Sequence, residues 1–146
     1  MAKFKFRLQG LLNVKEKIED RKRQEYGLAV AQVEREKQKK QDILDKKEAM
    51  IVEFRQCIDK IIKAGSHDSY NNFIEFLKEE VTRQEKVILE AQKKVEMKRQ
   101  ELVDAMRERK TLEKLSERQY EEFLLGQKLA EQKIVDEIVS YRSNRV

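Results

Sequence analysis

Residues 70–102 read YNNFIEFLKEEVTRQEKVILEAQKKVEMKRQEL, and this stretch decides the fold of the chain. Apolar residues recur in it at every seventh position without interruption: Ile74, Val81, Ile88, Val95 and Leu102. The companion position of the repeat is filled largely by Leu77, Ala91, Ala105 and Leu112. A seven-residue repeat sustained over this length is typical of a helix whose apolar seam packs against another helix. The stretch therefore predicts a coiled coil.

The absence of proline among the 146 residues favours very long helices, because proline disrupts a helix interior. Working outward from the repeat, we expect a second helix at about 70–143 and a first helix at about 5–63. The segment AGSHDS, residues 64–69, is expected to be the turn between them. Gly65 suits a helix stop, because glycine adopts the left-handed conformation without penalty. The candidate caps of the second helix are Ser66, Asp68 and Ser69.

The first helix carries an apolar face of its own. Its members recur at spacings of three, four and seven, as one face of a helix does. They are Leu8, Leu11, Leu12, Val14, Ile18, Ala29, Val33, Ile43, Leu44, Ile51, Phe54, Ile58 and Ile61. A connection as short as 64–69 makes consecutive helices antiparallel neighbours. The sequence thus predicts an all-α fold, a long antiparallel two-helix coiled-coil hairpin that forms a single domain over 1–146.

Folding the chain about residue 66 predicts a register in which the numbers of paired residues add up to about 132. The two apolar patterns, read independently, agree in this register. The expected pairs are Ile58 with Ile74, Phe54 with Leu77, Ile51 with Val81, Leu44 with Ile88, Leu12 with Tyr120 and Leu8 with Leu124.

The middle of the predicted hairpin is polar. Residues 34–42 contain no apolar side chain, and Lys98 and Arg109 stand at seam positions of the second helix. The expected register brings Arg109 close to Arg23, where Glu25 is available to neutralise the charge. One interpretation is a solvated stretch of coiled coil. The other is a soft point, since a seam without apolar residues loses burial worth about 25 cal/mol per Å².

Composition limits the classes of function. Charged residues make up 42% of the chain, tryptophan is absent and the net charge is +5, of which the first 63 residues carry +6 (17 basic, 11 acidic). This excess is weaker than the dense basic patch of a dedicated nucleic-acid binder, so no nucleic-acid partner is expected. The start has no apolar signal segment, and no run of about 18 apolar residues suggests a membrane span. We therefore expect a cytoplasmic protein.

No constellation of residues suggests catalysis, a cofactor or a metal. The single histidine, His67, is expected to be a solvated loop residue, and the single cysteine, Cys57, a small packing residue. No glycine-rich phosphate loop occurs. A two-helix hairpin also lacks the concave pocket that an enzyme needs. The chain is therefore expected not to be an enzyme and to hold no cofactor and no metal.

Apolar residues that lie off the predicted seam gather near the two ends of the hairpin. They include Phe4, Phe6, Phe73, Phe76, Leu125 and Ile138. A concentration of exposed apolar side chains is typical of contact sites for partners.

Three stretches in this order resemble the FliJ family of flagellar export proteins. The first is the opening FKFRLQGLL, residues 4–12, followed by Lys15, Glu16 and Glu19. The second is YNNFIEFL at 70–77, and the third is LEKLSERQ at 112–119, followed by Lys133, Asp136 and Glu137. Chain length, turn position and the absence of proline fit the family along the whole sequence.

The resemblance implies a non-enzymatic cytoplasmic component of the flagellar type III export apparatus, peripheral to the inner face of the cell membrane at the flagellar base. Its fold would be similar to the central stalk of rotary ATPases. Its partners would be the hexameric export ATPase, the cytoplasmic part of the export gate and export chaperones. It would reach the membrane only through the export apparatus.

Carried over onto matching residues, the resemblance implies that Phe73 and Leu77 contact the export gate, with Glu80 and Gln84 farther along the same face. The paired terminal segments would face the ATPase. The candidate ATPase contacts are Phe4, Phe6, Arg7, Leu8, Gln9, Arg118 and Gln119.

Two further hypotheses stay open at this point. The chain fits a stand-alone coiled-coil scaffold or holding chaperone that grips unfolded proteins through its exposed aromatic residues. It also fits a coiled coil that lies on nucleic acid or on an anionic membrane through its basic first helix.

Overall fold

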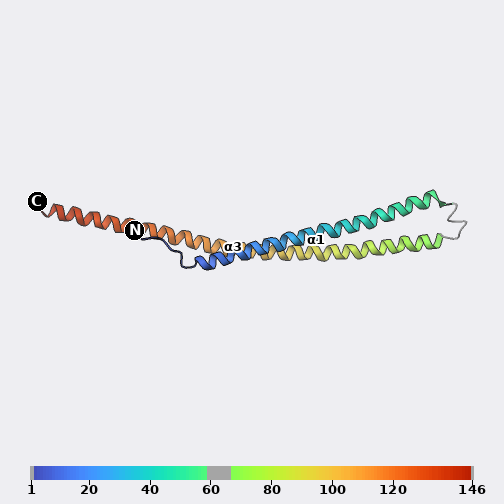
Figure 1. Ribbon diagram of the computed structural model, residues 1–146, viewed down its shortest axis with the longest axis horizontal. Helices are drawn as coiled ribbons and strands as arrows, with labels where there is room; N and C mark the ends of the chain where they lie inside the picture. Colours follow the sequence, from blue (N-terminus) through green and yellow to red (C-terminus); the bar gives the residue numbers. More distant parts are fainter. Residues whose placement is uncertain (1, 59–66, 146) are drawn as a thin grey trace. The chain divides into compact units, whose positions relative to one another are not determined.

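The computed structural model describes residues 2–58 and 67–145. Its two helices are α1, Gln9–Gln56, and α3, His67–Ser143 (Figure 1). No strand occurs in these described ranges. The expected all-α fold built from two long helices is confirmed.

The helix ends differ from the expected ones. α1 begins at Gln9 rather than at residue 5, since the segment before it is non-helical and the Phe6 carbonyl accepts a 3.1 Å bond from the Gln9 amide. α1 ends at Gln56, and the expected stop at Gly65 and cap at Ser66 lie outside the described residues. His67 and Asp68 belong to α3 rather than to a turn. Asp68 lies in the first turn, where the helix dipole favours a carboxylate.

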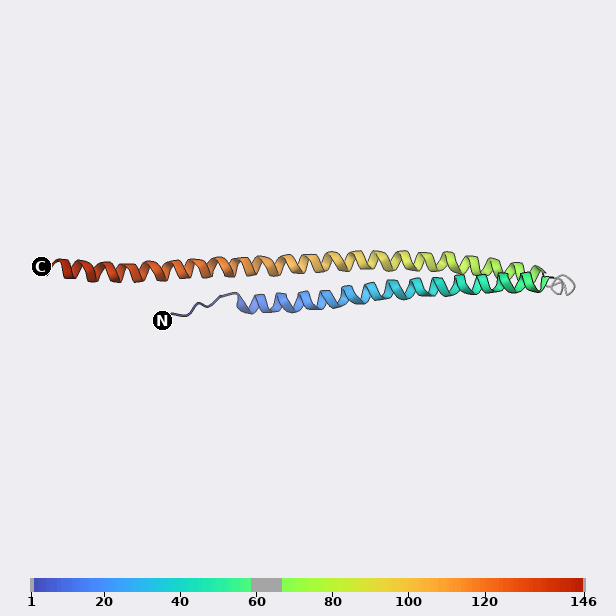
Figure 2. The same cartoon turned by 90° about the horizontal axis from the view of Figure 1, so that it is seen from above.

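The chain divides into two compact units. Unit 1 contains Met1–Arg21 and Val103–Val146, and unit 2 contains Lys22–Leu102. In unit 2 the α1 segment and the α3 segment run side by side in opposite directions, as both views show (Figures 1 and 2). The predicted antiparallel pairing is therefore confirmed within this unit.

The register predicted from the apolar patterns was wrong by about nine residues. In unit 2 the numbers of paired residues add up to 123 for Lys22 with Glu101, and to 124 for Phe54 with Tyr70, against the expected 132. The physical reason lies in the helix ends: the midpoint between Gln56 and His67 falls between residues 61 and 62, not at 66.

The seam of α3 follows the seven-residue repeat. Leu77, Ile88 and Leu102 are buried, and Ile74, Val81 and Val95 are half-buried. On α1 the seam of unit 2 includes the buried Ala29 and Val33. The apolar face expected for the first helix is only partly inside: Leu11 and Val14 of α1 are exposed, and so are Leu8 and Ile58, which lie outside α1. Two polar residues of α1, Glu19 and Glu36, are buried instead.

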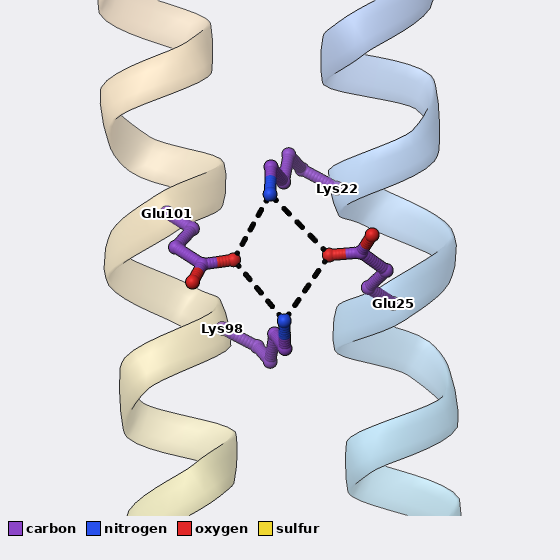
Figure 3. Close-up of polar contacts among 4 residues, drawn as sticks. All are labelled: Lys22, Glu25, Lys98 and Glu101. Carbon is purple, nitrogen blue, oxygen red and sulfur yellow. Dashed lines mark hydrogen bonds and ion pairs between the residues drawn. The ribbon is translucent and has the colours of Figure 1, made fainter.

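Four charged side chains close the seam of unit 2 in a square (Figure 3). Lys22 lies 3.2 Å from Glu101 and 3.5 Å from Glu25, and Lys98 lies 3.3 Å from each of the same two carboxylates. The hydrogen bond from Lys98 lowers the pKa of Glu25, and hydrogen bonds from Lys22 and Lys98 lower the pKa of Glu101. Hydrogen bonds to Glu25 and Glu101 raise the pKa of Lys98. Glu25, Glu101 and Lys98 are therefore held in their charged forms. We call the four residues Lys22, Glu25, Lys98 and Glu101 the charge square.

A second polar contact lies farther along unit 2. Gln84 donates from its amide nitrogen to a carboxylate oxygen of Glu36 at 2.5 Å and to the Glu36 backbone carbonyl at 2.9 Å. The bond from Gln84 lowers the pKa of Glu36. Glu36 is only 6% exposed, so the interpretation of 34–42 as a solvated stretch does not hold at this residue.

Unit 1 has a polar contact of the same kind. Glu19, 5% exposed, accepts from the Arg109 guanidinium, which also donates to Glu113 at 2.7 Å. Arg109 therefore pairs with Glu19 and Glu113 within unit 1, whereas Glu25, which was expected to neutralise it, pairs with Lys22 and Lys98 in unit 2. The predicted approach of Arg109 to Arg23, a residue of unit 2, stays a prediction. Phe6, Leu12 and Ala105 form the buried apolar part of this unit.

Candidate functional site

Aromatic rings join the last turns of α1 to the first turns of α3 in unit 2. The Phe54 ring stacks on Tyr70, with centroids 3.8 Å apart and planes at 14°. The His67 ring meets Phe54 edge-on at 5.8 Å. Stacked and edge-on rings add stability beyond their buried area. His67 is exposed, but it is part of a helix rather than of a loop, and its Nδ1 lies 2.9 Å from the Asn71 amide nitrogen.

Phe73 and Phe76 extend this ring system toward solvent. Their centroids are 6.3 Å apart, and the Lys46 ammonium lies 5.7 Å from the Phe73 ring, within reach of a cation–π interaction. Phe76 is 50% exposed and Phe73 is half-buried. Leu77, expected to share a contact surface with Phe73, is 3% exposed and packs in the seam. The exposed neighbour of Phe73 is therefore Phe76.

A cavity of about 350 Å³ opens beside Phe73. Its walls come from both helices and are mostly apolar: Met50, Phe54, Cys57, Tyr70 and Phe73, with Glu53 and Ser69. This volume lies at the lower end of the range of small ligand pockets, large enough for an apolar side chain of a partner. Cys57 is half-buried and lines the cavity. We call Phe73, Phe76 and this cavity the aromatic surface.

The residues expected to contact an ATPase gather in unit 1. Phe4 packs against Tyr120 at 5.3 Å and against Phe123 at 5.6 Å, which holds the N-terminal segment along α3. The carbonyl of Ala2 accepts from the Gln127 side chain at 3.2 Å. Phe6 is buried at 8% exposure and so acts in packing. Arg7, Leu8, Gln9 and Arg118 are exposed, and Gln119 is half-buried.

Beyond Gln127, every described residue of α3 is exposed. Large apolar side chains lie there at 50–61% exposure: Leu129, Ile134, Val135, Ile138, Val139 and Tyr141. Ile134, Ile138 and Tyr141 share one helix face because they are four and three residues apart. We call 128–145 together with the exposed N-terminal residues the terminal surface.

The remaining sequence candidates fall into place around these surfaces. Glu80 is half-buried and pairs with Arg83, whereas Gln84 is occupied by Glu36 in the seam. Within 2–58 and 67–145, no group of three or more His, Cys, Asp and Glu residues is arranged to hold a metal ion. Over the same ranges, neither helix contains an apolar stretch long enough to cross a membrane.

Sequence reasoning missed several residues that build the aromatic surface. Tyr70 and Met50 were not recognised as neighbours of Phe54, because the expected register paired Phe54 with Leu77. The signal was present in the sequence: Met50, Phe54 and Cys57 are spaced by four and three, as one helix face requires.

Two long antiparallel helices, a seam with ion pairs and exposed rings beside it define a coiled-coil protein with apolar interaction surfaces. Comparison with known proteins specifies the family. Residues 4–146 match the family described as Flagellar FliJ protein. The Flagellar FliJ protein of Bacillus subtilis (strain 168) is 29% identical over 139 residues, which cover 92% of each chain. No solved structure shows a significant match.

The chain belongs to the FliJ family, since the match spans nearly all of its residues. The predicted resemblance is thereby confirmed. With it the chain is assigned to the flagellum as a component of the flagellar export apparatus.

Proposed function

We propose that this chain is a non-enzymatic coupling protein of the export apparatus. It links the hexameric export ATPase to the cytoplasmic part of the export gate and assists the recycling of export chaperones. It works in the cytoplasm, at the inner face of the membrane beneath the flagellum. The observation that carries the proposal is the presence, in a FliJ-family chain, of two apolar surfaces built by different residues.

The aromatic surface is the proposed contact for the export gate. Phe73 and Phe76 offer rings, and the adjacent cavity of about 350 Å³ accepts an apolar side chain of the partner. Protein interfaces concentrate their binding energy in such buried aromatic anchors. Because Leu77 is 3% exposed, we assign it to packing, and Phe76 replaces it beside Phe73 as the contact residue.

The terminal surface is the proposed contact for the ATPase. Arg7, Leu8 and Gln9 are exposed there, as are the apolar residues of 128–145, and the exposed Arg118 of α3 is a further proposed contact. The Arg118 side chain is 79% exposed and its partner Glu122 lies 3.3 Å away, so the guanidinium keeps donors for a second acceptor. Phe4 and Phe6 support this surface by packing rather than by direct contact.

The gate contact is tested with Phe73→Ala, measured by calorimetric titration against the purified cytoplasmic part of the cognate gate protein. We expect binding to weaken by about 2 kcal/mol, roughly 30-fold, as for a buried anchor. Leu125→Ala is the matched control, because Leu125 lies on the same helix at 59% exposure, in unit 1. Unchanged gate binding by a folded Phe73→Ala chain would remove the aromatic surface from the gate contact.

The ATPase contact is tested with Arg118→Ala against the cognate export ATPase. Arg99→Ala is the matched control, since Arg99 is also an exposed arginine of α3 that pairs with a glutamate, Glu96. Its side chain is 50% exposed. We expect Arg118→Ala to weaken ATPase binding and to leave gate binding intact, and Phe73→Ala to do the reverse. If each variant affected both partners equally, the two surfaces would not be separate contacts and the coupling proposal would fail.

A further inference from the structure

The polar contacts of the seam stand where coiled coils ordinarily place apolar residues. In unit 2 these are the charge square of Lys22, Glu25, Lys98 and Glu101 and the Glu36–Gln84 pair (Figure 3). In unit 1 the same place is taken by Glu19 with Arg109. Glu36 and Glu19 are among the most buried side chains of the described residues, at 6% and 5% exposure. Buried charges contribute little net stability, so a different role has to be sought.

The apolar residues alone do not distinguish one register from the next. Ile74, Val81, Ile88, Val95 and Leu102 repeat every seven residues, so sliding α3 by seven replaces four of the five with a residue of similar size. Knobs-into-holes packing repeats at that same interval. The two apolar patterns even agree in a register about nine residues away from the observed one. Something other than apolar packing therefore selects the register.

The polar contacts do distinguish the registers. If α3 slid by seven in one direction, Lys22 would face Lys94 instead of Glu101, and Glu25 would face Ala91 instead of Lys98. Glu36 would face Leu77 after that slide and Ala91 after the opposite one. After either slide the buried Glu36 faces an apolar side chain and loses its bond from Gln84, and after the first slide the half-buried Lys22 faces a like charge. Losing a hydrogen bond to a charged group, or facing a like charge, is destabilising, whereas the observed register supplies an opposite charge or a donor across the seam to each of these groups.

We propose that the charge square and the Glu36–Gln84 pair lock α1 and α3 of unit 2 into a single register, with Glu19–Arg109 acting in the same way within unit 1. A polar residue at a seam position is known to specify register in coiled coils at some cost in stability. The lock decides which apolar residues remain at the surface: it keeps Leu77 in the seam, and it keeps Phe54 on Tyr70 beside the cavity. This inference holds whether or not the aromatic surface binds the export gate.

The register is measured by cross-linking the full-length chain in a Cys57→Ser background. Lys40 and Glu85 form a 3.1 Å ion pair, so Lys40→Cys with Glu85→Cys reports the observed register through a short bismaleimide. Lys40→Cys with Lys78→Cys reports the register shifted by seven, and Lys40→Cys with Gln92→Cys reports the opposite shift. With the polar contacts intact, we expect the first pair to link at least about tenfold faster than the others, because a shifted register loses the hydrogen bonds across the seam.

The lock is tested by inverting the charge square on one helix. Lys22→Glu with Glu25→Lys keeps the composition and the pairing along α1, but it sets like charges across the seam. We expect the preference for the observed register to fall by about tenfold or more. The matched control adds Lys98→Glu and Glu101→Lys, which restores opposite charges across the seam and should restore the preference.

A second variant decides the question should the one-sided inversion fail to fold. Leucine at all four positions of the square removes the charges and keeps an apolar seam. We expect it to be helical and no less stable than the parent chain, because apolar side chains at these half-buried positions replace the ion pairs without loss, yet to cross-link in shifted registers. If either folded variant keeps the full preference for the Lys40–Glu85 pair, or if the two-sided inversion fails to restore it, the charge square does not set the register.

Discussion

Two parts of unit 2 solve the same packing problem with different chemistry. One part, which we call the charged part, joins Lys22–Glu36 of α1 to Gln84–Glu101 of α3 through ion pairs and hydrogen bonds. The other, the aromatic part, joins Met50–Cys57 to His67–Leu77 through stacked rings around a cavity. In the charged part the polar groups of the seam satisfy one another. In the aromatic part the Phe76 ring stays exposed, and a cavity lies open beside Phe73.

The difference separates two requirements of a protein that binds partners along its length. Ion pairs are directional, so the charged part can define a register that apolar contacts leave ambiguous. Apolar rings are less directional and carry more burial, so the aromatic part can supply stability and an anchor for a partner. The following predictions test whether stability and partner contact do reside in the aromatic part and register in the charged part.

The largest expected effect comes from the most buried apolar residue of the aromatic part. Leu77→Ala removes a side chain that is 3% exposed and should lower the free energy of unfolding by about 2–5 kcal/mol. Urea denaturation followed by circular dichroism measures this. Leu125→Ala, at 59% exposure, should stay within about 0.5 kcal/mol of the parent chain. Equal effects of the two variants would show that the seam does not bury Leu77.

The ring stack gives the next effect. Phe54→Leu keeps an apolar side chain and removes the stack on Tyr70, which should cost about 1 kcal/mol. Phe76→Leu is the matched control, because Phe76 is 50% exposed and its ring is 6.3 Å from its nearest aromatic neighbour. Thermal unfolding of both chains measures the difference. A null result for Phe54→Leu would mean that burial alone, without ring geometry, accounts for the aromatic part.

The two parts were not equally predictable from the sequence. The seven-residue repeat of α3 identified the helix, its seam and its antiparallel partner, because this spacing has a single physical meaning. The register was missed because Gly65 suggested a turn centred at about residue 66, whereas the midpoint between the observed helix ends falls between residues 61 and 62. Glu36 was expected in solvent because it lies in the polar stretch 34–42, but bonds from Gln84 across the seam and from Gln32 and Lys39 along α1 satisfy its buried carboxylate.

The candidate surfaces, too, were predictable from the sequence only in part. That Phe73 and Phe76 lie off the seam followed from helical spacing, and both contribute to a surface. Helical spacing also places Leu77 on the seam, where it is 3% exposed. The family resemblance instead suggested that Leu77 contacts the export gate. The cavity was not predictable, since it depends on the contacts of Phe54 with Tyr70, which only the true register brings together.

A smaller effect is expected when the charged part is titrated. The pKa of Glu25, Glu36 and Glu101 is lowered below its ordinary value of 4.5 by hydrogen bonds from Lys98, Gln84 and Lys22 respectively. These carboxylates therefore contribute stability that is present above that value and is lost as the pH falls through the lowered pKa. The pKa of Lys98 is raised above 10.5 by Glu25 and Glu101, so its contribution is present below that value and is lost as the pH rises through the raised pKa.

The measurement is the melting temperature against pH. We expect it to decline in acid below about pH 4.5 and in alkali above about pH 10.5, with both slopes reduced in the chain that carries leucine at the four positions of the charge square. The size of the effect should be modest, because these side chains are partly exposed and water screens them. Identical slopes in both chains would assign the pH dependence to groups outside the charge square.

The smallest effect concerns local opening. Residues 34–42 and 92–100 have fewer apolar residues in the seam than the aromatic part, and local opening follows the density of such contacts. We expect their amide hydrogens to exchange several-fold sooner than those of 43–56 and 70–81, measured by mass spectrometry of peptides after deuterium labelling.

Glu36 and Gln84 should locally oppose this trend, because their bonds join the two helices within the polar stretch. Glu36→Ala, which removes the acceptor of the 2.5 Å bond, should therefore speed exchange in its own neighbourhood, whereas Glu34→Ala, at an exposed side chain, should not. Uniform protection along unit 2 would show that the ion pairs hold the helices together as firmly as the rings do, and the charged part would then be no soft point.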